Sequence, residues 1–308
     1  MRIAVTGASG FAGGTVWRLA AAEGWEVHAF GRRPASALGG TPPEGVYRSW
    51  DVTGPAPHDL PEVDAVVHCA GGVSDWGPAA EIFKVNVEGT RAVREAFPRS
   101  RFVHVSTASV YDPFRPTVMA REHECRARRY VNAYGASKAR AEEVLAGTAV
   151  VLRPHAVYGP GDTVLLPRVL RAVRGRRLFA VGDGRQRVSL TSGGNLARAC
   201  LLAASGPVAS GVFNVTDAEP VTLDDALRAL LRERGIDARP CYLPAAPVAA
   251  LATAAEAAFR VLRRPDPPTL TRYAASHLAV ERTLDITAAR EQLGYAPAPT
   301  SFAGAANW

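Results

Sequence analysis

The sequence of 308 residues is poor in cysteine, in lysine and in long apolar runs. Its four cysteines lie far apart without a C-x-x-C pair, which excludes a disulfide framework and a zinc knuckle. We therefore expect a cytoplasmic protein without a metal. The most apolar stretch, Leu243 to Leu262, contains prolines, Glu256 and Arg260, so it lacks the ~20 clean apolar residues of a membrane span. We predict that it forms an alanine-rich, buried helix. The first residues leave no room for the apolar core of a signal peptide.

Basic residues exceed acidic ones by 36 − 29 = +7, but only Lys84 and Lys138 are lysines, and the arginines are scattered along the chain. A basic surplus can indicate a nucleic-acid partner, yet no helix-turn-helix, zinc or RNA-binding pattern accompanies it, so we expect none. The one dense cluster, residues 121–129 (REHECRARR), is typical of a solvated loop, with docking of an acidic carrier protein as the alternative. The sequence leaves the choice between monomer and homodimer open.

Short strand-like runs alternate with longer helical patterns from the first residue, which is typical of βαβ units. This predicts an α/β fold with a doubly wound parallel sheet (Rossmann) and a smaller C-terminal mixed α/β substrate lobe. We assign residues 1–160 to a dinucleotide-binding domain, to which 191–217 return, and residues 161–190 and 218–308 to the substrate lobe. The predicted strands are Arg2–Thr6, Glu26–Phe30, Asp64–Cys69, Arg101–Ser106, Ala149–Arg153 and Gly211–Thr216. The predicted helices are Thr15–Glu23, Ala79–Phe97, Tyr134–Leu145, Leu166–Arg174 and Asn195–Ala204.

A glycine-rich turn follows the first predicted strand. In VTGASGFAGG, Gly7, Gly10 and Gly13 form a G-x-x-G-x-x-G pattern at the opening of the first predicted helix. Glycine allows a tight turn and a close backbone approach, and the N–H groups of the helix terminus are free to bind a pyrophosphate. Because the pattern has a strand before it and a helix after it, it predicts a dinucleotide site.

The end of the second strand bears on the choice between NAD and NADP. A carboxylate there accepts from the ribose 2′-hydroxyl, whereas arginine pairs with a 2′-phosphate. Gly31 stands where the acid would be, and Arg32 and Arg33 follow, so we favour NADP(H) over NAD(H). Two solvated surface arginines are the alternative. Asp51 is expected either to accept from the adenine amino group or to cap a turn.

Tyr134 and Lys138 are four residues apart in AYGASKARAEEVL, so a helix places both side chains on one face. A phenol with a pKa of about 10 is a poor acid near pH 7, and a neighbouring ammonium favours the phenolate. With eight tyrosines and two lysines in the chain, a chance occurrence of this spacing is rare. The pattern therefore indicates a proton-transfer pair.

Hydroxyl side chains close the strand in HVSTASVY, where Ser106, Thr107 and Ser109 are expected to face the ligand crevice. One of them would hold a substrate carbonyl; ordinary turn formation is the alternative. Asn86 is predicted to bridge its helix to the backbone of the site. His155 is expected to be a hydrogen-bonded core histidine.

These motifs resemble those of the extended short-chain dehydrogenase/reductases, within the NAD-dependent epimerase/dehydratase superfamily, and the resemblance covers nearly the whole chain. The segments that carry it are TGASGFAGG, NVEGTRAV, STASVY, YGASK and RPHAVYGPGD. The resemblance implies that Thr107 orients the carbonyl, Tyr134 donates the proton and Lys138 is its electrostatic partner. The further contacts we predict with the cofactor are Phe11, Ala70, Pro154 and Val157, and those with the substrate are Val73, Trp76 and Tyr158.

The C-terminal half resembles the 3β-hydroxysteroid dehydrogenase branch through FNVTDAEPVTLDD, PPTLTRY and TLDITAAREQLGYAP. A dehydratase of this superfamily would carry an Asp-Glu pair directly after Thr107, where Ala108 and Ser109 stand instead. The arginine that grips the diphosphate in sugar epimerases is replaced by Val188, although Arg187 is adjacent.

The sequence thus predicts an oxidoreductase that uses NADP(H) to reduce a ketone, or to oxidise the corresponding secondary alcohol, on a bulky and mostly apolar small molecule. The alternative is a nucleotide-sugar 4-epimerase or 4-ketoreductase. A third hypothesis is a protein that binds the cofactor without catalysis. The presence of the complete set of Thr107, Tyr134 and Lys138 argues against it.

Overall fold

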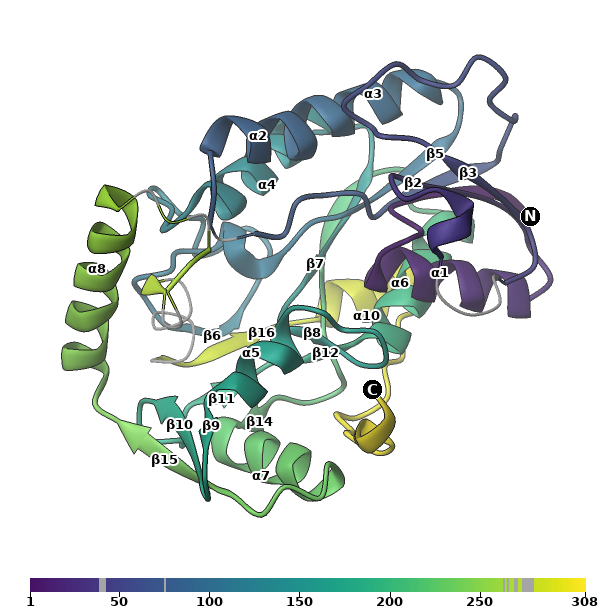
Figure 1. The fold of residues 1–308 in the computed structure, drawn as a ribbon. Coiled ribbons are helices and arrows are strands. Elements are labelled where there is room, and N and C mark those ends of the chain that lie inside the picture. The colour runs from purple at the N-terminus through teal and green to yellow at the C-terminus, as the bar shows by residue number, and fades with distance from the viewer. Residues whose placement is uncertain (39–42, 75, 263, 265, 269–270, 273–279) are drawn as a thin grey trace.

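The computed structural model describes residues 1–38, 43–74, 76–262, 264, 266–268, 271–272 and 280–308. Its centre is a parallel sheet of seven strands in the order β13-β7-β5-β4-β1-β2-β3 (Figure 1). The chain order reverses between β1 and β4, so the carboxyl ends of these strands border the usual ligand crevice of such sheets. The strands are β1 (Arg2–Thr6), β2 (Glu26–Gly31), β3 (Val46–Ser49), β4 (Ala65–His68), β5 (Arg101–Val105), β7 (Val150–Pro154) and β13 (Gly211–Val215).

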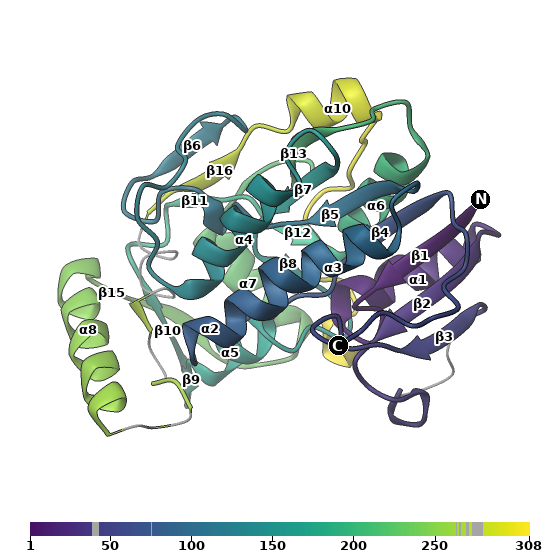
Figure 2. The ribbon, with the colours of Figure 1, turned by 90° about the horizontal axis from the view of Figure 1, so that it is seen from above.

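Helices cover both faces of this sheet, as Figure 2 shows. Successive side chains of a strand point to opposite faces, so Ile3 and Val5 pack in one apolar core and Ala4 in another. This is the doubly wound fold that the alternating pattern predicted. The first core is covered by α1 (Phe11–Ala22), α6 (Gly193–Ser205) and α10 (Thr287–Leu293). The other face carries α2 (Ala79–Phe83), η2 (Lys84–Glu88), α3 (Gly89–Ala96) and α4 (Ala133–Val144).

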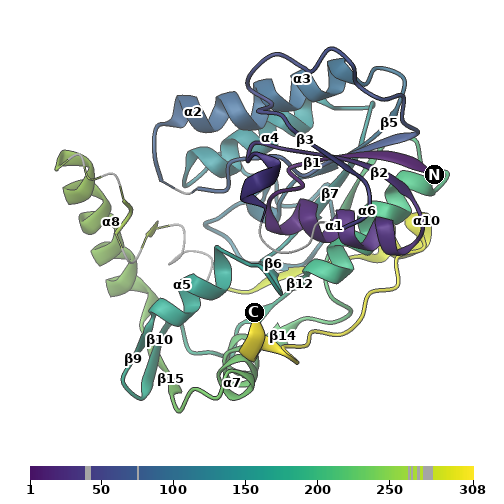
Figure 3. The ribbon, with the colours of Figure 1, turned by 45° about the vertical axis from the view of Figure 1, so that its right-hand side comes forward.

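A smaller lobe of short strands and helices lies below the carboxyl ends of the sheet (Figure 3). One small sheet has the order β14-β11-β16-β6, a second has the order β15-β10-β9, and β8 pairs with β12. The strands are β6 (Thr117–Ala120), β8 (Val157–Tyr158), β9 (Val173–Arg174), β10 (Arg177–Val181), β11 (Arg187–Val188), β12 (Thr191–Ser192), β14 (Val221–Thr222), β15 (Arg239–Leu243) and β16 (Arg282–Leu284). The helices are α5 (Leu165–Arg171), α7 (Leu223–Glu233) and α8 (Ala245–Val261), and short turns of 3-10 helix are η1 (Ala35–Ala37), η3 (Ala108–Val110) and η4 (Ala305–Asn307).

The two lobes exchange segments, which the predicted domain boundaries do not capture. β6, from the first 160 residues, pairs with β16 in the smaller lobe. Ile286, Ala289, Leu293 and Tyr295, from the last 30 residues, are buried in the core between α1, α6 and the main sheet. The predicted helix over Leu166–Arg174 is also too long: it ends at Arg171, and Gly175 with a φ of +55° then turns the chain from β9 into β10.

The predicted burial of the alanine-rich stretch is wrong. It does form a helix, α8, but only Val248, Ala252 and Glu256 of that helix are buried, whereas Leu251 is 65% exposed. Residues four apart form a narrow stripe on a helix, so α8 touches the protein along one line only. No helix in the described ranges is long and apolar enough to cross a membrane. The predicted motif PPTLTRY lies partly outside the described residues, at 269–270 and 273.

Candidate active site

The glycine turn after β1 is packed too closely for side chains. Gly7 has a φ of +71°, and a Cβ there would lie 2.6 Å from the backbone nitrogen of Ala70, at the end of β4. A Cβ on Gly13 would overlap the carbonyl of Gly7, and Gly10 forms the N-cap of α1 without a side chain in the way. The turn thus presents the N-terminus of α1 as an open backbone cradle, which fits the pyrophosphate of a dinucleotide.

Phe11, the first residue of α1, connects this turn with the start of α6. A Cβ on Gly193 would lie 3.0 Å from the ring of Phe11, and one on Gly159 would lie 3.5 Å from it. The loop after β8 therefore approaches the glycine turn across the end of the sheet. Phe11 and Ala70 both lie at this turn, and their role as cofactor contacts stays a prediction.

The side chains of Ser9 and Tyr47 pack closely against Gly31 at the end of β2. A Cβ on Gly31 would lie 2.6 Å from Ser9 Oγ and 2.7 Å from the hydroxyl of Tyr47. The following backbone is held by β3, because Tyr47 donates to the carbonyl of Arg33 at 2.6 Å and Ser49 donates to that of Arg32 at 3.3 Å. Both arginine side chains are exposed, and neither makes an ion pair within the described part of the chain. The guanidinium groups are thus available to an anion.

Asp51 lies in the turn after β3 and is exposed. One carboxylate oxygen, Oδ1, accepts from the backbone N–H of Thr53 at 2.9 Å and from its hydroxyl at 2.8 Å. These two bonds, and then the charges of Arg32 and Lys84, lower the pKa of Asp51. The turn-capping role that we weighed is therefore present.

Tyr134 and Lys138 lie one turn apart on α4, as their spacing predicted. The helix begins at the N-cap Asn132, whose side chain accepts from the N–H of Gly135 at 3.0 Å. A Cβ on Gly135 would lie 2.8 Å from the carbonyl of Ser109, so only glycine lets α4 approach the loop after β5 this closely. Tyr134 is partly exposed, whereas Lys138 is only 5% exposed.

The Lys138 ammonium is anchored to β5. Its Nζ donates to the carbonyl of Val105 at 2.6 Å and lies 3.2 Å from Nε2 of His104. Burial lowers the pKa of Lys138 to about 8, although Glu142 and Cys69 act in the opposite direction. An ammonium has three donors, so one remains for groups outside the strand.

Asn86 lies in η2, a π-helical turn inside an otherwise continuous helix, where the pattern predicted regular helix from Ala79 to Phe97. Such turns contain one extra residue and are frequent at functional sites. The Asn86 side chain accepts from the N–H of Gly72 at 2.7 Å and donates to the Gly72 carbonyl at 3.1 Å and to Ser137 Oγ at 2.9 Å. The amide thus ties the loop after β4 to α4, as we predicted.

Thr107 follows β5 and is 8% exposed. Its Oγ1 accepts from the N–H of Ser109 at 3.1 Å and donates to Ser109 Oγ, also at 3.1 Å. The hydroxyl therefore caps the short helix η3 directly beside the tight approach of α4. Ser106 instead points inward and donates to Glu142 Oε1 at 2.5 Å, so it is not available to a substrate.

The segment that leaves β7 carries three residues with predicted roles. Pro154 is the buried last residue of β7, and Val157 in β8 packs against the core of the main sheet. Tyr158 differs from the prediction: it is 1% exposed, and its hydroxyl donates to Asp217 at 2.8 Å. Its ring lies 4.9 Å from that of Phe302, so Tyr158 is a core residue rather than a substrate contact.

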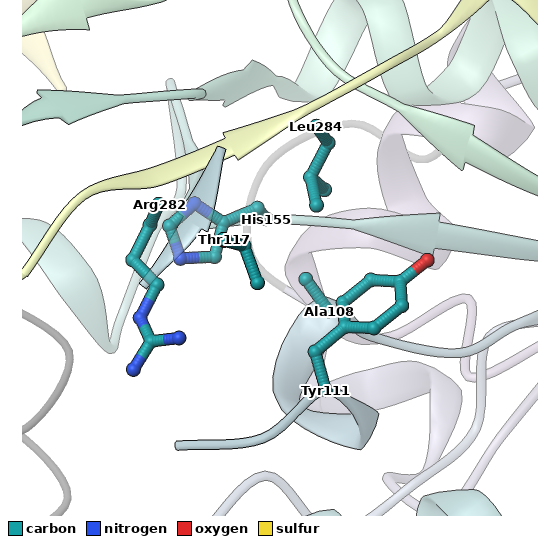
Figure 4. A pocket seen from close by; sticks show the side chains of 6 residues that line it. All are labelled: Ala108, Tyr111, Thr117, His155, Arg282 and Leu284. Carbon is teal, nitrogen blue, oxygen red and sulfur yellow. The ribbon is translucent and has the colours of Figure 1, made fainter. Parts of the chain in front are cut away.

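His155 Nδ1 lies 2.6 Å from the carbonyl of Ser189, and burial lowers the pKa of His155 to about 4. It is hydrogen-bonded, as we expected, but it is half-buried at the edge of the core rather than fully inside it. A small cavity of about 10 Å³, enough for one water, lies beside it (Figure 4). The residues that line this cavity are Ala108, Tyr111, Thr117, His155, Arg282 and Leu284.

The loop after β4 reaches the smaller lobe through Trp76. The indole Nε1 donates to the carbonyl of Arg264 at 3.3 Å, and the guanidinium of Arg260 on α8 lies 5.1 Å from the centre of a Trp76 ring. Val73, in the same loop, is 55% exposed. This contact brings together the two regions that we expected to enclose the substrate.

A buried polar network below the site escaped the sequence analysis. Arg153 on β7 donates to Glu142 Oε1 at 3.0 Å and to Oε2 at 2.6 Å, and both side chains are almost completely buried. Arg153 also donates to the hydroxyl of Tyr111 at 3.0 Å, and this hydroxyl donates to Asn214 Oδ1 at 2.6 Å. The network joins α4, β7, β13 and the residue after η3, and Glu142 places it one helical turn beyond Lys138. Glu142, one turn beyond Lys138, was the only available signal.

Among the residues that the structure describes, no group of three His, Cys, Asp or Glu side chains could hold a metal ion. The Arg121–Arg129 cluster is partly engaged. Arg121 pairs with Asp285 at 3.2 Å, and Glu122 accepts from the N–H of Asn214 at 2.8 Å.

Several known proteins are similar to this chain in sequence or in fold over most of its length. A ketoreductase of Stigmatella aurantiaca, named for 4-hydroxy-2-methyl-3-oxo-4-farnesyl-3,4-dihydroquinoline-1-oxide, is 32% identical over 96% of this chain and 92% of its own. A 2-alkyl-3-oxoalkanoate reductase of Shewanella oneidensis is 30% identical over 94% of this chain and 81% of its own. The solved structure of MoeE5 in complex with UDP-glucuronic acid and NAD has the same fold, with a TM-score of 0.72 at 23% identity, and the match covers 98% of this chain and 95% of that chain.

The model of the NAD dependent epimerase/dehydratase family matches residues 3–216. With that match and with relatives above 30% identity over nearly its full length, the chain belongs to the NAD dependent epimerase/dehydratase family.

Proposed function

We propose that this protein is an oxidoreductase that uses NADP(H) to reduce a ketone on a bulky, mostly apolar small molecule. The observation that carries the proposal is the placement of Tyr134 and the buried Lys138 ammonium on one face of α4, at the end of β5. Tyrosine is the acid that carbonyl reduction requires, and a neighbouring cation makes it a usable one near neutral pH.

When bound, the nicotinamide cofactor would supply the hydride that the carbonyl carbon accepts. Tyr134 donates its hydroxyl proton to the carbonyl oxygen, so that the ketone becomes a secondary alcohol and a phenolate remains. The Lys138 ammonium stabilises that phenolate, and Thr107 turns its hydroxyl from Ser109 toward the carbonyl oxygen. The reverse sequence oxidises the alcohol. The backbone N–H groups at the start of α1 would hold the pyrophosphate, with Phe11, Ala70, Pro154 and Val157 along the rest of the cofactor.

The substrate class follows from the loop and helix that meet at Trp76. Val73 and the indole of Trp76 offer apolar surface beside Arg260 of α8. The two reductases that resemble this chain are named for a farnesylated quinoline oxide and for 2-alkyl-3-oxoalkanoates, both of which carry ketones beside apolar chains. We therefore infer an alkyl or polycyclic ketone.

The nucleotide-sugar alternative has less support from the residues present. Val188 is buried in the core of the smaller lobe, and Arg187 donates to the carbonyl of Pro220 at 3.3 Å. Neither side chain is placed as a diphosphate grip. Ala108 and Ser109 likewise supply no acid–base pair for dehydration.

Consumption of NADPH with a panel of alkyl, 2-alkyl-3-oxo acid and polycyclic ketones tests the proposal. We expect turnover of at least one apolar ketone and release of NADP⁺. Tightly bound NAD in the purified protein, together with binding of a UDP- or dTDP-sugar and no consumption of NADPH, would support the alternative and reject the reductase.

Replacing Arg32 and Arg33 tests the NADP(H) preference. The Arg32→Ala and Arg33→Ala double variant removes at least one charged hydrogen bond, and since one such bond contributes about 1.5–3 kcal/mol, we expect NADPH binding to weaken by at least roughly 10-fold. NADH, which has no 2′-phosphate, should bind as before. Fluorescence titration of both cofactors measures this, with Arg176→Ala, an exposed arginine far along the chain, as the control. Equal weakening for both cofactors would contradict the assignment.

The charge of Lys138 makes the enzyme sensitive to alkali. Since burial lowers the pKa of Lys138 to about 8, the ammonium is present below that pH and is lost above it. We expect kcat/KM for NADPH, which reports ionisations of the free enzyme, to fall as the pH rises through about 8. A profile that stays flat up to pH ~10, the ordinary lysine range, would contradict this.

A further inference from the structure

Two histidines lie in the centre of the main sheet, and the proposed reaction uses neither. His68 on β4 and His104 on β5 are both completely buried, and their rings stack with centroids 5.3 Å apart. Buried histidines normally have hydrogen-bond partners for both ring nitrogens. The two residues differ in this respect.

His68 has both partners. Thr90 Oγ1 donates to the carbonyl of Asn86 at 2.7 Å, so it accepts from His68 Nε2 at 2.9 Å. His68 Nδ1 then accepts from Thr6 Oγ1 at 2.7 Å. Burial lowers the pKa of His68 to about 3, so the ring is neutral and structural.

In the part of the chain that the structure describes, the ring of His104 has one hydrogen-bond partner, the Lys138 ammonium. Its Nε2 lies 3.2 Å from Lys138 Nζ, whereas Nδ1 is buried without a hydrogen-bond partner among the described residues. An ammonium can only donate, so Nε2 must be the bare acceptor and Nδ1 must carry the hydrogen. The ring thus holds an unsatisfied donor in the core, which costs about 1–3 kcal/mol.

Several titratable groups lie around Lys138, and His104 is the one whose ring accepts a hydrogen bond from its ammonium. On α4, Glu142 lies one turn further along, and both of its oxygens are engaged by Arg153, one of them also by Ser106. On β4, burial lowers the pKa of His68 to about 3, so its ring is neutral near pH 7, and Arg140 and Glu143 on α4 pair with each other at the surface. No carboxylate in the described ranges pairs directly with the ammonium.

We propose that His104 is a positioning residue that holds the Lys138 ammonium, in its charged form and with one N–H free, below Tyr134. The role of that ammonium in catalysis rests on the proposed function, but the hydrogen bond itself does not. The Val105 carbonyl and His104 Nε2 take two of the three donors, which directs the third away from β5. An unsatisfied Nδ1–H is the consequence of keeping Nε2 as an acceptor.

Loss of the acceptor is expected to make the ammonium less stable. Hydrogen bonds to the charged form of a group favour that form, so His104→Leu should lower the pKa of Lys138 by about one unit. His104→Gln places an amide oxygen within reach of Lys138 and should restore most of the difference. His68→Leu removes an equally buried histidine without a bond to Lys138, and is the matched control.

The scarcity of lysine makes the pKa of Lys138 directly measurable. In a Lys84→Arg background the chain has a single lysine, so protein labelled with carbon-13 lysine gives one Cε signal, whose chemical shift is followed against pH. No cofactor or substrate is needed. We expect a midpoint near 8 in this background, a decrease of about one unit in His104→Leu, and less than about 0.3 units of change in His104→Gln and His68→Leu. An unchanged midpoint in His104→Leu overturns the proposal.

A second measurement is made on the unsubstituted protein, with His104→Gln used only to assign the signal, and covers the case in which His104→Leu does not fold. Nitrogen-15 spectra of labelled histidine side chains distinguish the two neutral tautomers, and the His104 signal is the one that disappears in His104→Gln. We expect hydrogen on Nδ1 and a bare Nε2. Hydrogen on Nε2 would overturn the proposal. Because neither measurement uses turnover, their failure is separate from the absence of ketone reductase activity, which would reject only the proposed function.

Discussion

Replacing Tyr134 by phenylalanine should lower kcat for ketone reduction about 10²- to 10⁴-fold, which is the usual contribution of a positioned general acid. The substitution removes one oxygen from a partly exposed side chain at the first turn of α4, where the N-cap bond from Gly135 to Asn132 keeps the helix in place. Binding of NADPH should change less than about threefold, because Tyr134 acts on the substrate oxygen. Steady-state kinetics and fluorescence titration of the cofactor separate the two effects.

Tyr130→Phe provides the control for this experiment. Tyr130 is another partly buried tyrosine, whose ring packs beside Gly135 at the start of α4. Its substitution is expected to leave kcat within about twofold, since it has no assigned role in proton transfer. Full activity in Tyr134→Phe, or an equal loss in both variants, would reject Tyr134 as the proton donor.

Replacing Arg153 by methionine should destabilise the folded protein by about 3–5 kcal/mol, because it leaves the buried Glu142 carboxylate without its partner. Arg153 is 2% exposed and Glu142 6% exposed, and Arg153 also supplies bonds to Tyr111 and to the carbonyl of Glu122. Urea unfolding followed by circular dichroism measures the loss.

The double variant Glu142→Met and Arg153→Met is the informative comparison. It removes both charges, so we expect it to be more stable than the Arg153→Met single variant by at least about 1 kcal/mol. Arg140→Met breaks an exposed ion pair with Glu143 on the same helix and should cost less than about 1 kcal/mol. A double variant that loses the sum of the two single losses would show that the charges act independently.

The parts of the site that lie close together along the chain could be predicted from the sequence. The glycine turn and the Tyr134–Lys138 pair depend on the geometry of one strand-to-helix turn and of one helical turn, which local spacing determines. Asn86 is a weaker case, because its partner Ser137 lies 51 residues away. The sequence indicated that the Asn86 amide bridges two parts of the site, but it did not indicate the π-helical turn that orients this side chain.

Features that depend on contacts between segments far apart in the chain could not be predicted from the sequence. The acceptor role of His104 exists only because β5 and α4 pack side by side, and the residue reads as an ordinary member of an apolar strand. Tyr158 directly follows Val157, a predicted cofactor contact, yet its hydroxyl donates to Asp217 in the core. The exposure of α8 was missed because composition shows that a helix is apolar, not what covers it.

The burial of Ile286, Ala289, Leu293 and Tyr295 against the main sheet has a consequence for biosynthesis. Tyr295 donates to the carbonyl of Thr216 at 2.9 Å, so a segment that lies far beyond β13 in the chain closes the apolar face between β13 and α6. Domains usually fold from the N-terminus during translation. Here a nascent chain in which all seven strands of the main sheet have been synthesised must wait for residues 286–295, and a truncation at residue 280 would leave that face open to chaperones and proteases.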